Sequence, residues 1–228
     1  MLRQSLARLS HLFRRRPRYH GLNELDRKLE AHLDFDRGIF VEAGANDGLN
    51  QSNTLYFETR RRWRGLLVEP IPALAERCRR NRPRALVECC ALVPLDDAGK
   101  TLTMVDANLM SLVRGAMKTA EDERRHIATA SAIQRLEPRE VEVVGQPLSL
   151  LLDRHGFAHV DLLSLDVEGY ELQALKGIDF ARHRPRFILV EARYRAEIDA
   201  FLAPHYTVRD VLSHHDVLYA ARDPTAVI

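Results

Sequence analysis

The chain has 228 residues, 46% of them hydrophobic and 29% charged, which is typical of one sizeable soluble domain with a packed core. Its formal net charge of +2 gives no global basic field, which argues against nucleic acid as a partner. Three cysteines without Cys-x-x-Cys spacing argue against a disulfide framework or structural zinc and favour the reducing cytoplasm, and no apolar run reaches the roughly 20 residues that span a bilayer.

The N-terminal segment combines apolar residues at helical spacing with six arginines. The apolar positions are Leu2, Leu6, Leu9 and Phe13. Over residues 1–18 this pattern predicts a basic amphipathic helix in peripheral contact with the anionic inner face of a membrane. A short helix docked on the domain, or a frayed tail, fits the same residues. We assign residues 1–37 to an N-terminal extension and 38–228 to the main domain.

From residue 22 to residue 105 the chain alternates helices with apolar strands. Helical spacing and capping signals predict helices over 22–33, 52–62 and 73–80, and apolar runs predict strands over 39–42, 65–69 and 85–91. A turn at 96–99 then leads into 101–105, which reads as one strand of an antiparallel pair.

The second half begins with a segment that departs from this alternation. Residues 106–137 are highly charged and have few apolar positions, which predicts a surface lid or insertion. Regular structure then returns, with strands over 141–144, 160–165 and 187–190, a helix over 148–154, a short helix that ends at Gly177, and a terminal hairpin that joins 206–211 to 217–220. Strand–helix alternation predicts an α/β fold in which helices cover both faces of a mostly parallel sheet.

The segment Ile39–Gly48 carries the strongest functional signal. An apolar run ends at Glu42 and leads into the turn Gly44-Ala-Asn-Asp-Gly48, which is how a parallel strand delivers a loop to a nucleotide-like cofactor. Carboxylates in such a turn would repel a pyrophosphate, which binds to bare backbone N–H groups. A cofactor with a cationic head and no phosphate suits them, which describes S-adenosylmethionine (SAM). We assign Glu42 to the methionine end of SAM, whereas Asp47 either contacts the cofactor or stabilises the loop.

Four acidic residues each end an apolar strand, namely Glu42, Glu69, Asp166 and Glu191. Ligands of open α/β sheets bind outside the carboxyl ends of the strands, so these side chains are expected on one rim. Glu69 lies 21 positions beyond Gly48, close to the spacing at which an acid accepts hydrogen bonds from ribose hydroxyls. That role is common to NAD and SAM, and the alternative is a carboxylate that stabilises the dipole of the next helix.

Two motifs together resemble a known family. Val41-Glu-Ala-Gly-Ala-Asn-Asp-Gly48 and Asp161-Leu-Leu-Ser-Leu-Asp-Val-Glu-Gly-Tyr-Glu-Leu-Gln-Ala-Leu-Lys-Gly177 closely resemble the FkbM-type methyltransferases, and the likeness extends from about residue 39 to 191. It implies a Rossmann-like class I methyltransferase fold, with a seven-stranded, mostly parallel sheet and a terminal antiparallel hairpin. It also implies SAM as methyl donor and usually a hydroxyl acceptor on a sugar, glycan or glycosylated metabolite.

The resemblance also assigns the cofactor contacts. The implied set is Glu42, Gly44, Asn46, Asp47, Gly48, Glu69, Pro70, Cys90, Ala91, Ser111 and Asp166. Cys89-Cys90 stands where the family usually has a more polar residue, often Asn, so the chain departs from the family in its adenine contacts.

Methyl transfer from a sulfonium needs in-line alignment more than activation. A sugar hydroxyl is a poor nucleophile, and a general base typically contributes about 10²–10⁴-fold. We predict Asp166 as base or acceptor-orienting carboxylate and Glu168 as its support, with Glu171 either on the same helix face or simply solvated. Alternatively, Asp166, Glu168 and Glu191 hold Mg²⁺, which would lower the pKa of a bound hydroxyl.

The histidines are weaker candidates for the site, and two other functions fit parts of the sequence. His126 is expected at the surface. His214 and His215 are expected in a solvated hairpin turn, and the alternative is that they face the site. A Rossmann-type NAD-dependent oxidoreductase is disfavoured by the acidic turn, the terminal hairpin, and the lack of both a third glycine and a Tyr-x-x-x-Lys pair. A non-catalytic relative that binds SAM or a glycan stays open. The sequence carries no signal for the particular sugar or for the oligomeric state.

Overall fold

A computed structural model of the chain describes residues 19–222, so the N-terminal helix predicted over 1–18 lies outside the described residues. The domain is built on a seven-stranded sheet of order β10-β11-β9-β8-β1-β2-β3. Its strands are β1 (Ile39–Ala43), β2 (Arg64–Val68), β3 (Leu86–Glu88), β8 (Leu162–Leu165), β9 (Phe187–Glu191), β10 (Tyr206–Val211) and β11 (Asp216–Ala221). Strand β11 runs antiparallel to both of its neighbours, β10 and β9, and all other neighbouring pairs are parallel. The predicted sheet, including the terminal hairpin, is confirmed.

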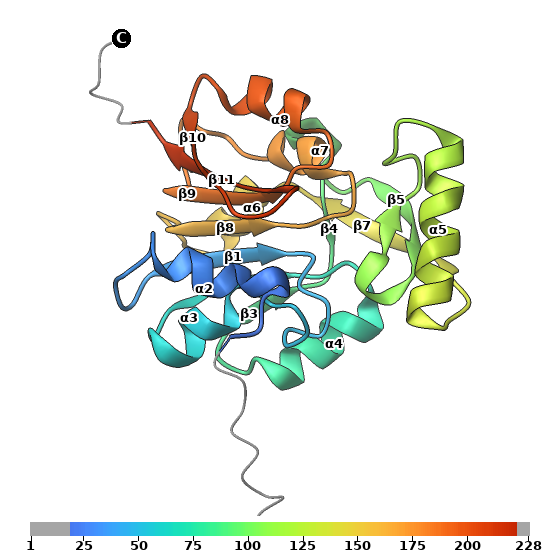
Figure 1. Ribbon diagram of the computed structural model, residues 1–228, viewed down its shortest axis with the longest axis horizontal. Helices are drawn as coiled ribbons and strands as arrows, with labels where there is room; N and C mark the ends of the chain where they lie inside the picture. Colours follow the sequence, from blue (N-terminus) through green and yellow to red (C-terminus); the bar gives the residue numbers. More distant parts are fainter. Residues whose placement is uncertain (1–18, 223–228) are drawn as a thin grey trace, which may run out of the picture.

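Helices cover both faces of this sheet (Figure 1). One layer contains α2 (Leu25–Glu30), α3 (Leu55–Arg60) and α4 (Pro72–Asn81), and the other contains α6 (Leu148–His155), α7 (Glu171–Leu175) and α8 (Arg195–Leu202). Successive strand residues face opposite layers. Phe40 therefore joins the core beneath α2 and α3, whereas Val41 joins the core beneath α6, α7 and α8. Among residues 19–222, every helix is too short or too polar to cross a bilayer.

A smaller, four-stranded sheet stands beside the carboxyl edge of the large one (Figure 1). It consists of β4 (Ala91–Leu92), β7 (Arg139–Gln146), β5 (Thr101–Asp106) and β6 (Leu112–Val113). The segment predicted as a lid, 106–137, contains the 3-10 turn η3 (Asn108–Met110), β6 and helix α5 (Ala120–Gln134). β5 pairs antiparallel with β6 and β7, as predicted for this strand.

Two predicted elements differ from the structure, and one helix was not predicted. The apolar run 85–91 is two strands in different sheets, because the chain leaves β2 after Glu88 and pairs with β7 from Ala91. The predicted helix over 22–33 is interrupted by positive φ angles at Asn23 and Glu24, which lie in the turn η1 (Leu22–Glu24). Helix α8 was not predicted at all. A third 3-10 turn, η2 (Leu95–Asp97), precedes β5.

Candidate functional site

A cavity of about 800 Å³, part of it open to solvent, lies at the carboxyl ends of β1, β2 and β8. Residues of β5, η3 and β6 close its other side. The predicted site residues that line it are Glu42, Gly44, Asn46, Glu69, Pro70, Cys90, Ala91, Ser111, Asp166 and Glu168. Asp47, Gly48 and Glu191 are not among its lining residues. The structure thus brings most of the predicted set around one space.

The glycine turn is shaped by two close approaches. Gly44 has φ +80°, and a Cβ there would lie 1.8 Å from the carbonyl oxygen of Asp166. Only glycine therefore lets the end of β1 meet the end of β8. Gly48 has φ +78°, and a Cβ there would meet the buried side chains of Arg82 and Cys78 at 2.8–2.9 Å. Gly44 is exposed to the cavity, so its bare backbone is open to a ligand.

Asp47 does not line the cavity, and its side chain stabilises the loop that follows it. Its Oδ1 accepts hydrogen bonds from the backbone N–H of Leu49 at 2.9 Å and of Asn50 at 2.8 Å. Its Oδ2 accepts from the side-chain amide of Asn50 at 3.1 Å. Asp47 therefore has the loop-stabilising role that the sequence left open, and its contact with the cofactor stays a prediction.

The Glu42 carboxylate is buried and already engaged by the protein. It accepts hydrogen bonds from Ser52 Oγ at 2.8 Å, the Asn53 N–H at 2.7 Å and Thr54 Oγ1 at 2.6 Å. Glu42 therefore anchors the loop that follows the glycine turn, while part of its side chain lines the cavity. Its contact with the methionine end of SAM stays a prediction.

Arg82 was missed by the sequence reasoning. It follows α4 and is only 1% exposed. Its guanidinium donates to Glu58 Oε2 at 2.6 Å, to the carbonyl oxygen of Gly48 at 2.9 Å, and to Ser52 Oγ and Thr54 Oγ1, both at 3.1 Å. Arg82 thus fixes the glycine turn and the Glu42 loop against each other. An arginine among the exposed arginines of residues 77–84 carries no sequence signal of burial.

Glu69 lies at the end of β2 and lines the cavity. Its Oε2 accepts from the Asn46 N–H at 2.7 Å and its Oε1 from the Ile71 N–H at 2.9 Å. Burial raises its pKa to about 7. The bond to Ile71, the residue before α4, matches the helix-start role considered for Glu69. Each carboxylate oxygen can still accept a further hydrogen bond, so the ribose role is compatible with it.

A chain of amides joins the glycine turn to the lid segment. Asn46 Nδ2 donates to Asn108 Oδ1, and Asn108 Nδ2 donates to Gln134 Oε1 of α5, both at 3.1 Å. Ser111 Oγ donates to the Asn108 carbonyl oxygen at 2.8 Å and accepts from the Ala107 N–H at 3.0 Å. Ser111 therefore shapes η3 as well as lining the cavity.

One wall of the cavity is apolar. Pro70, Cys90, Ala91, Leu92 and Met104 contribute to it. Cys90 is buried, and burial raises the pKa of its thiol to about 12, so it presents a neutral surface at any physiological pH. A flat aromatic ring could pack against this apolar wall. Cys90 lies in it at the position where the resemblance implies a more polar side chain.

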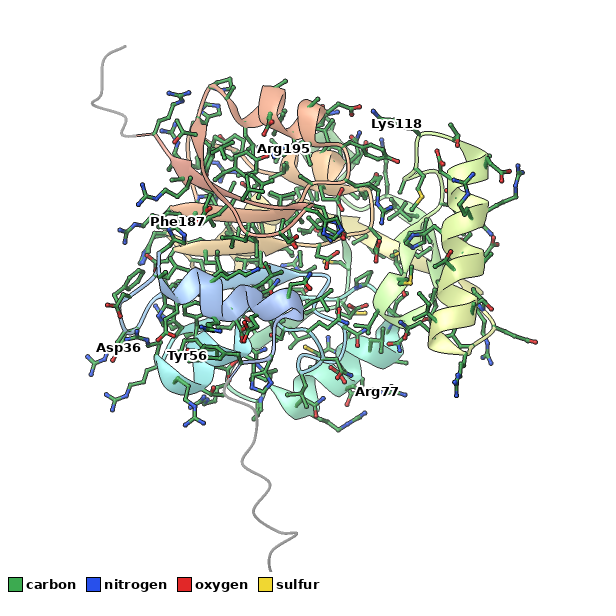
Figure 2. The ribbon with its side chains drawn as sticks, viewed as in Figure 1. Asp36, Tyr56, Arg77, Lys118, Phe187 and Arg195 are labelled. Atoms are coloured by element: carbon green, nitrogen blue, oxygen red, sulfur yellow. The ribbon has the colours of Figure 1, made fainter. Side chains whose placement is uncertain are left out.

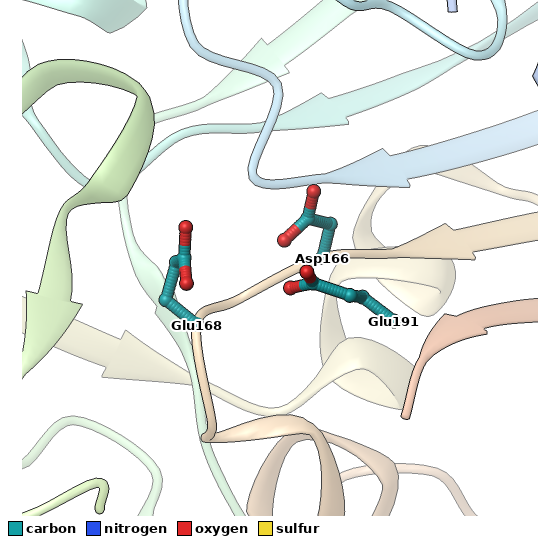
Figure 3. A group of neighbouring side chains, drawn as sticks. All are labelled: Asp166, Glu168 and Glu191. Atoms are coloured by element: carbon teal, nitrogen blue, oxygen red, sulfur yellow. The ribbon is translucent and has the colours of Figure 1, made fainter. Parts of the chain in front are cut away.

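The acidic end of the cavity joins the ends of β8 and β9. One carboxylate oxygen from each of Asp166, Glu168 and Glu191 lies within 4.8 Å of the others, and Figure 3 shows the three carboxyl groups turned toward one space. Enclosure by the protein, followed by the charges of Glu191 and Glu168, raises the pKa of Asp166 well above its ordinary value. Burial, followed by the charge of Glu191, raises that of Glu168 to about 8. Asp166 is exposed to the open cavity, so water moderates this effect until a ligand fills the space.

One arginine and two histidines, from three separate segments of the chain, flank these acids. Arg193 Nη2 donates to Glu168 Oε2 at 2.9 Å, and His126 Nε2 lies 3.8 Å from the same oxygen. His215 Nε2 lies 3.5 Å from Glu191 Oε1. The surface position predicted for His126 is wrong: it is buried on α5, with Nε2 3.0 Å from the Met110 carbonyl oxygen. His215 therefore takes the less favoured of its two predicted positions, whereas the sequence carried no signal that His126 reaches the site from α5.

Glu171 is fully buried, so the solvated alternative for this residue is wrong. Its Oε1 accepts from the Gly169 N–H at 2.8 Å, which shapes the turn that presents Glu168. Its Oε2 is buried without a hydrogen-bond partner in the described part of the chain. Burial raises the pKa of Glu171 to about 7.

Comparisons with known proteins show the family of the chain. The sequence profile of the Methyltransferase FkbM domain matches residues 42–219. Among solved structures, the chain is similar to a methyltransferase FkbM from Methylobacillus flagellatus, with 19% identity and a TM-score of 0.48 over 81% of this chain and 44% of that one. It is also similar to a TehB-like SAM-dependent methyltransferase from Corynebacterium glutamicum, with 8% identity and a TM-score of 0.45 over 96% of each chain. No curated protein sequence matches. The chain thus spans less than half the length of the Methylobacillus protein.

Proposed function

Because the chain belongs to the methyltransferase FkbM domain family, we propose that it is a SAM-dependent O-methyltransferase whose acceptor is a hydroxyl of a sugar, glycan or glycosylated metabolite. One observation carries the proposal. A single cavity has the glycine turn and Glu69 at one end and the carboxylates of Asp166 and Glu168 at the other. The first end suits a nucleoside, and the second suits an acceptor that must lose a proton.

The residues present fit SAM. Gly44 lines the cavity and its backbone is exposed to it, and Glu69 keeps free lone pairs for ribose hydroxyls. The apolar wall around Cys90 and Met104 would pack against the adenine ring. SAM, when bound, supplies a methyl group already activated on a sulfonium. The negative charge of the acidic end would favour that cationic centre.

Asp166 is our candidate general base. A carboxylate whose pKa is raised is a stronger base than that of an ordinary aspartate. The raised pKa of Asp166 therefore suits proton abstraction from a hydroxyl. Glu168, held by Arg193 at 2.9 Å, would orient the acceptor beside it.

The alternative use of the same end is to hold a divalent cation. Asp166, Glu168 and Glu191 offer converging oxygen atoms, which is the ligand type that Mg²⁺ prefers. Such an ion would lower the pKa of a bound hydroxyl and replace the general base. Titration calorimetry with MgCl₂ and an assay with EDTA separate the two uses. Activity that persists unchanged in EDTA contradicts the Mg²⁺ alternative.

The decisive experiment combines binding with transfer. Titration calorimetry of the full chain with SAM and S-adenosylhomocysteine should give a Kd between about 1 μM and 1 mM, the usual range of enzyme affinities for substrates. Methyl-labelled SAM incubated with an extracted glycan fraction should then give a labelled glycan. The absence of SAM binding in that range contradicts the proposal. Tight NADH binding would favour the oxidoreductase, and SAM binding without transfer would favour the non-catalytic relative.

A further inference from the structure

A second groove lies directly beside the acidic end of the cavity. It has a volume of about 590 Å³, part of it open to solvent. Tyr170 lines both the cavity and the groove. Glu168 lines the cavity, whereas the next residue, Gly169, lines the groove. The two spaces therefore adjoin at the turn that presents Glu168.

Three segments form the walls of the groove. Residues 115–118 belong to the segment predicted as a lid and connect β6 to α5. Leu172 and Gln173 lie on α7, and Glu197 lies on α8. In Figure 2, Lys118 lies between α5 and the layer that contains α7 and α8. The groove thus runs between the lid segment and this helical layer.

Lys118 holds the lid segment against the start of α8. Its backbone N–H donates to the Tyr194 hydroxyl at 3.1 Å, and its ammonium group lies 4.6 Å from the centre of the Tyr194 ring and pairs with Glu197. Gly169 packs close to this contact: a Cβ there would lie 3.6 Å from the Ala116 carbonyl oxygen and 3.8 Å from the Tyr194 ring. These contacts fix the walls of the groove relative to each other.

The lining of the groove combines ring surface with hydrogen-bonding groups. Tyr170 and Tyr194 supply the rings. The Gln173 amide oxygen accepts from Lys176 Nζ at 3.3 Å, and the amide nitrogen donates to no residue in the described part of the chain. The one lysine and the one glutamate of the lining pair with each other. A neutral polar occupant suits this lining, because an ion would meet no free counter-charge and an apolar chain would leave polar groups unsatisfied.

We propose, on the basis of the function proposed above, that this groove binds a further sugar ring of the acceptor, next to the sugar that is methylated beside Asp166. A pyranose ring offers an apolar C–H face to a tyrosine ring, and hydroxyl groups that hydrogen-bond to an amide and a carboxylate. Both kinds of partner line the groove. The acceptor is therefore a glycan or glycoside of at least two rings, not a free monosaccharide.

Contacts with the second ring act on turnover as well as on affinity. Binding energy from a part of the substrate that does not react positions the reacting group, so shortened substrates lose kcat as well as binding. Because Glu168 and Gly169 are neighbours in the chain, a ring held in the groove fixes the next ring at the acidic end. We expect the intact acceptor to react at least tenfold faster than its monosaccharides at equal, subsaturating concentration.

Labelled methyl transfer by the full chain tests this with two acceptors, the extracted glycan fraction and the same fraction hydrolysed to monosaccharides. The groove variant combines Gln173→Ala with Glu197→Ala, which removes hydrogen-bonding groups from α7 and α8 and leaves every buried side chain in place. It should lower the rate with the intact fraction at least tenfold, and the loss with the monosaccharides should be at least fivefold smaller. The control, Lys176→Ala, is exposed and outside the groove and should change either rate by less than twofold.

A binding measurement separates failure of this proposal from failure of the proposed function. Fluorescence anisotropy of the labelled glycan fraction is followed as protein is added, in the presence of excess S-adenosylhomocysteine. Weaker binding by the groove variant supports the sugar site even if no acceptor is methylated, a result that would contradict only the methyl transfer. Gln173→Ala alone serves if the double substitution lowers the melting temperature.

Three results overturn the proposal. The first is a groove variant that binds and methylates the intact fraction like the unmodified chain. The second is an equal loss of rate with the intact and the hydrolysed acceptors, which would show damage to the cavity and not to a separate subsite. The third is a glycan fraction that binds neither protein.

Discussion

At the scale of single residues, the position of Asp166 follows from the packing of two strand ends. The missing Cβ of Gly44 brings β1 within contact of the Asp166 backbone, and Glu191 ends the neighbouring strand β9. The carboxylate is therefore held at the junction of the cofactor turn and the acidic end. A side chain in that place can act on an acceptor without being needed to bind the cofactor.

We predict that Asp166→Asn retains SAM affinity within about threefold and lowers kcat by about 10²–10⁴-fold, the usual contribution of a general base. The substitution keeps the shape of the side chain and removes only its charge and basicity. Calorimetry gives the affinity and labelled methyl transfer gives kcat. Asp96→Asn, on an exposed turn, is the matched control and should change neither. Turnover near normal in Asp166→Asn would remove Asp166 from this role.

Residues at strand ends could be predicted, whereas those that reach the site from elsewhere could not. Glu69, Asp166 and Glu191 were found because the carboxyl ends of parallel strands share one rim. Arg82 contacts residues 24–34 positions away in the sequence. Because it lies among several exposed arginines, the sequence does not distinguish it as buried. His126 lies on a helix whose polar composition indicates exposure, yet it contacts Met110 and approaches Glu168.

At the scale of elements, the parallel strands were predictable because each is a short apolar run followed by a polar loop. The division of 85–91 between β3 and β4 was not predictable, since Cys89 and Cys90 continue the apolar run while β4 pairs with β7, about 50 residues later. Helix α8 was missed because it is short and its buried side chains are few: only Ile198 and Leu202 are buried, and three of its other six positions are charged.

The end of α4 determines the geometry of the cofactor loop through Arg82, and this contact can be tested. We predict that Arg82→Gln lowers the free energy of unfolding by about 3 kcal/mol, because it leaves the buried Glu58 without its main partner, and that it raises the KM for SAM more than it lowers kcat. Urea unfolding and steady-state kinetics measure the two effects. Arg80→Gln, exposed on α4, should alter stability by less than about 0.5 kcal/mol. A loss below 1 kcal/mol in Arg82→Gln, or an unchanged KM, would contradict the positioning role.

At the scale of the whole molecule, one sheet edge gathers several carboxyl groups whose pKa values are all raised. Burial raises those of Glu69 and Glu171 to about 7 and that of Glu168 to about 8. Ionisation of these groups in the folded state is unfavourable. The acidic end of the cavity therefore lowers the free energy of unfolding of the domain. The two hydrophobic cores, one on each face of the sheet, supply the stability that offsets this loss.

The cost should appear as a fall in stability with rising pH, and Glu171 isolates it. A carboxyl group whose pKa is raised by folding contributes stability below its unfolded pKa, and loses it as the pH rises through the folded value. For Glu171 this window runs from about 4.5 to about 7. We therefore predict that Glu171→Gln, compared with the unmodified chain, gains up to about 3 kcal/mol in unfolding free energy between pH 5 and pH 8. Urea unfolding of both ligand-free proteins across this range measures the difference. His20 and His126, whose pKa values are lowered by burial, act in the opposite sense but equally in both proteins. A difference that stays constant, or that shrinks as the pH rises, would show that Glu171 is charged in the folded state throughout.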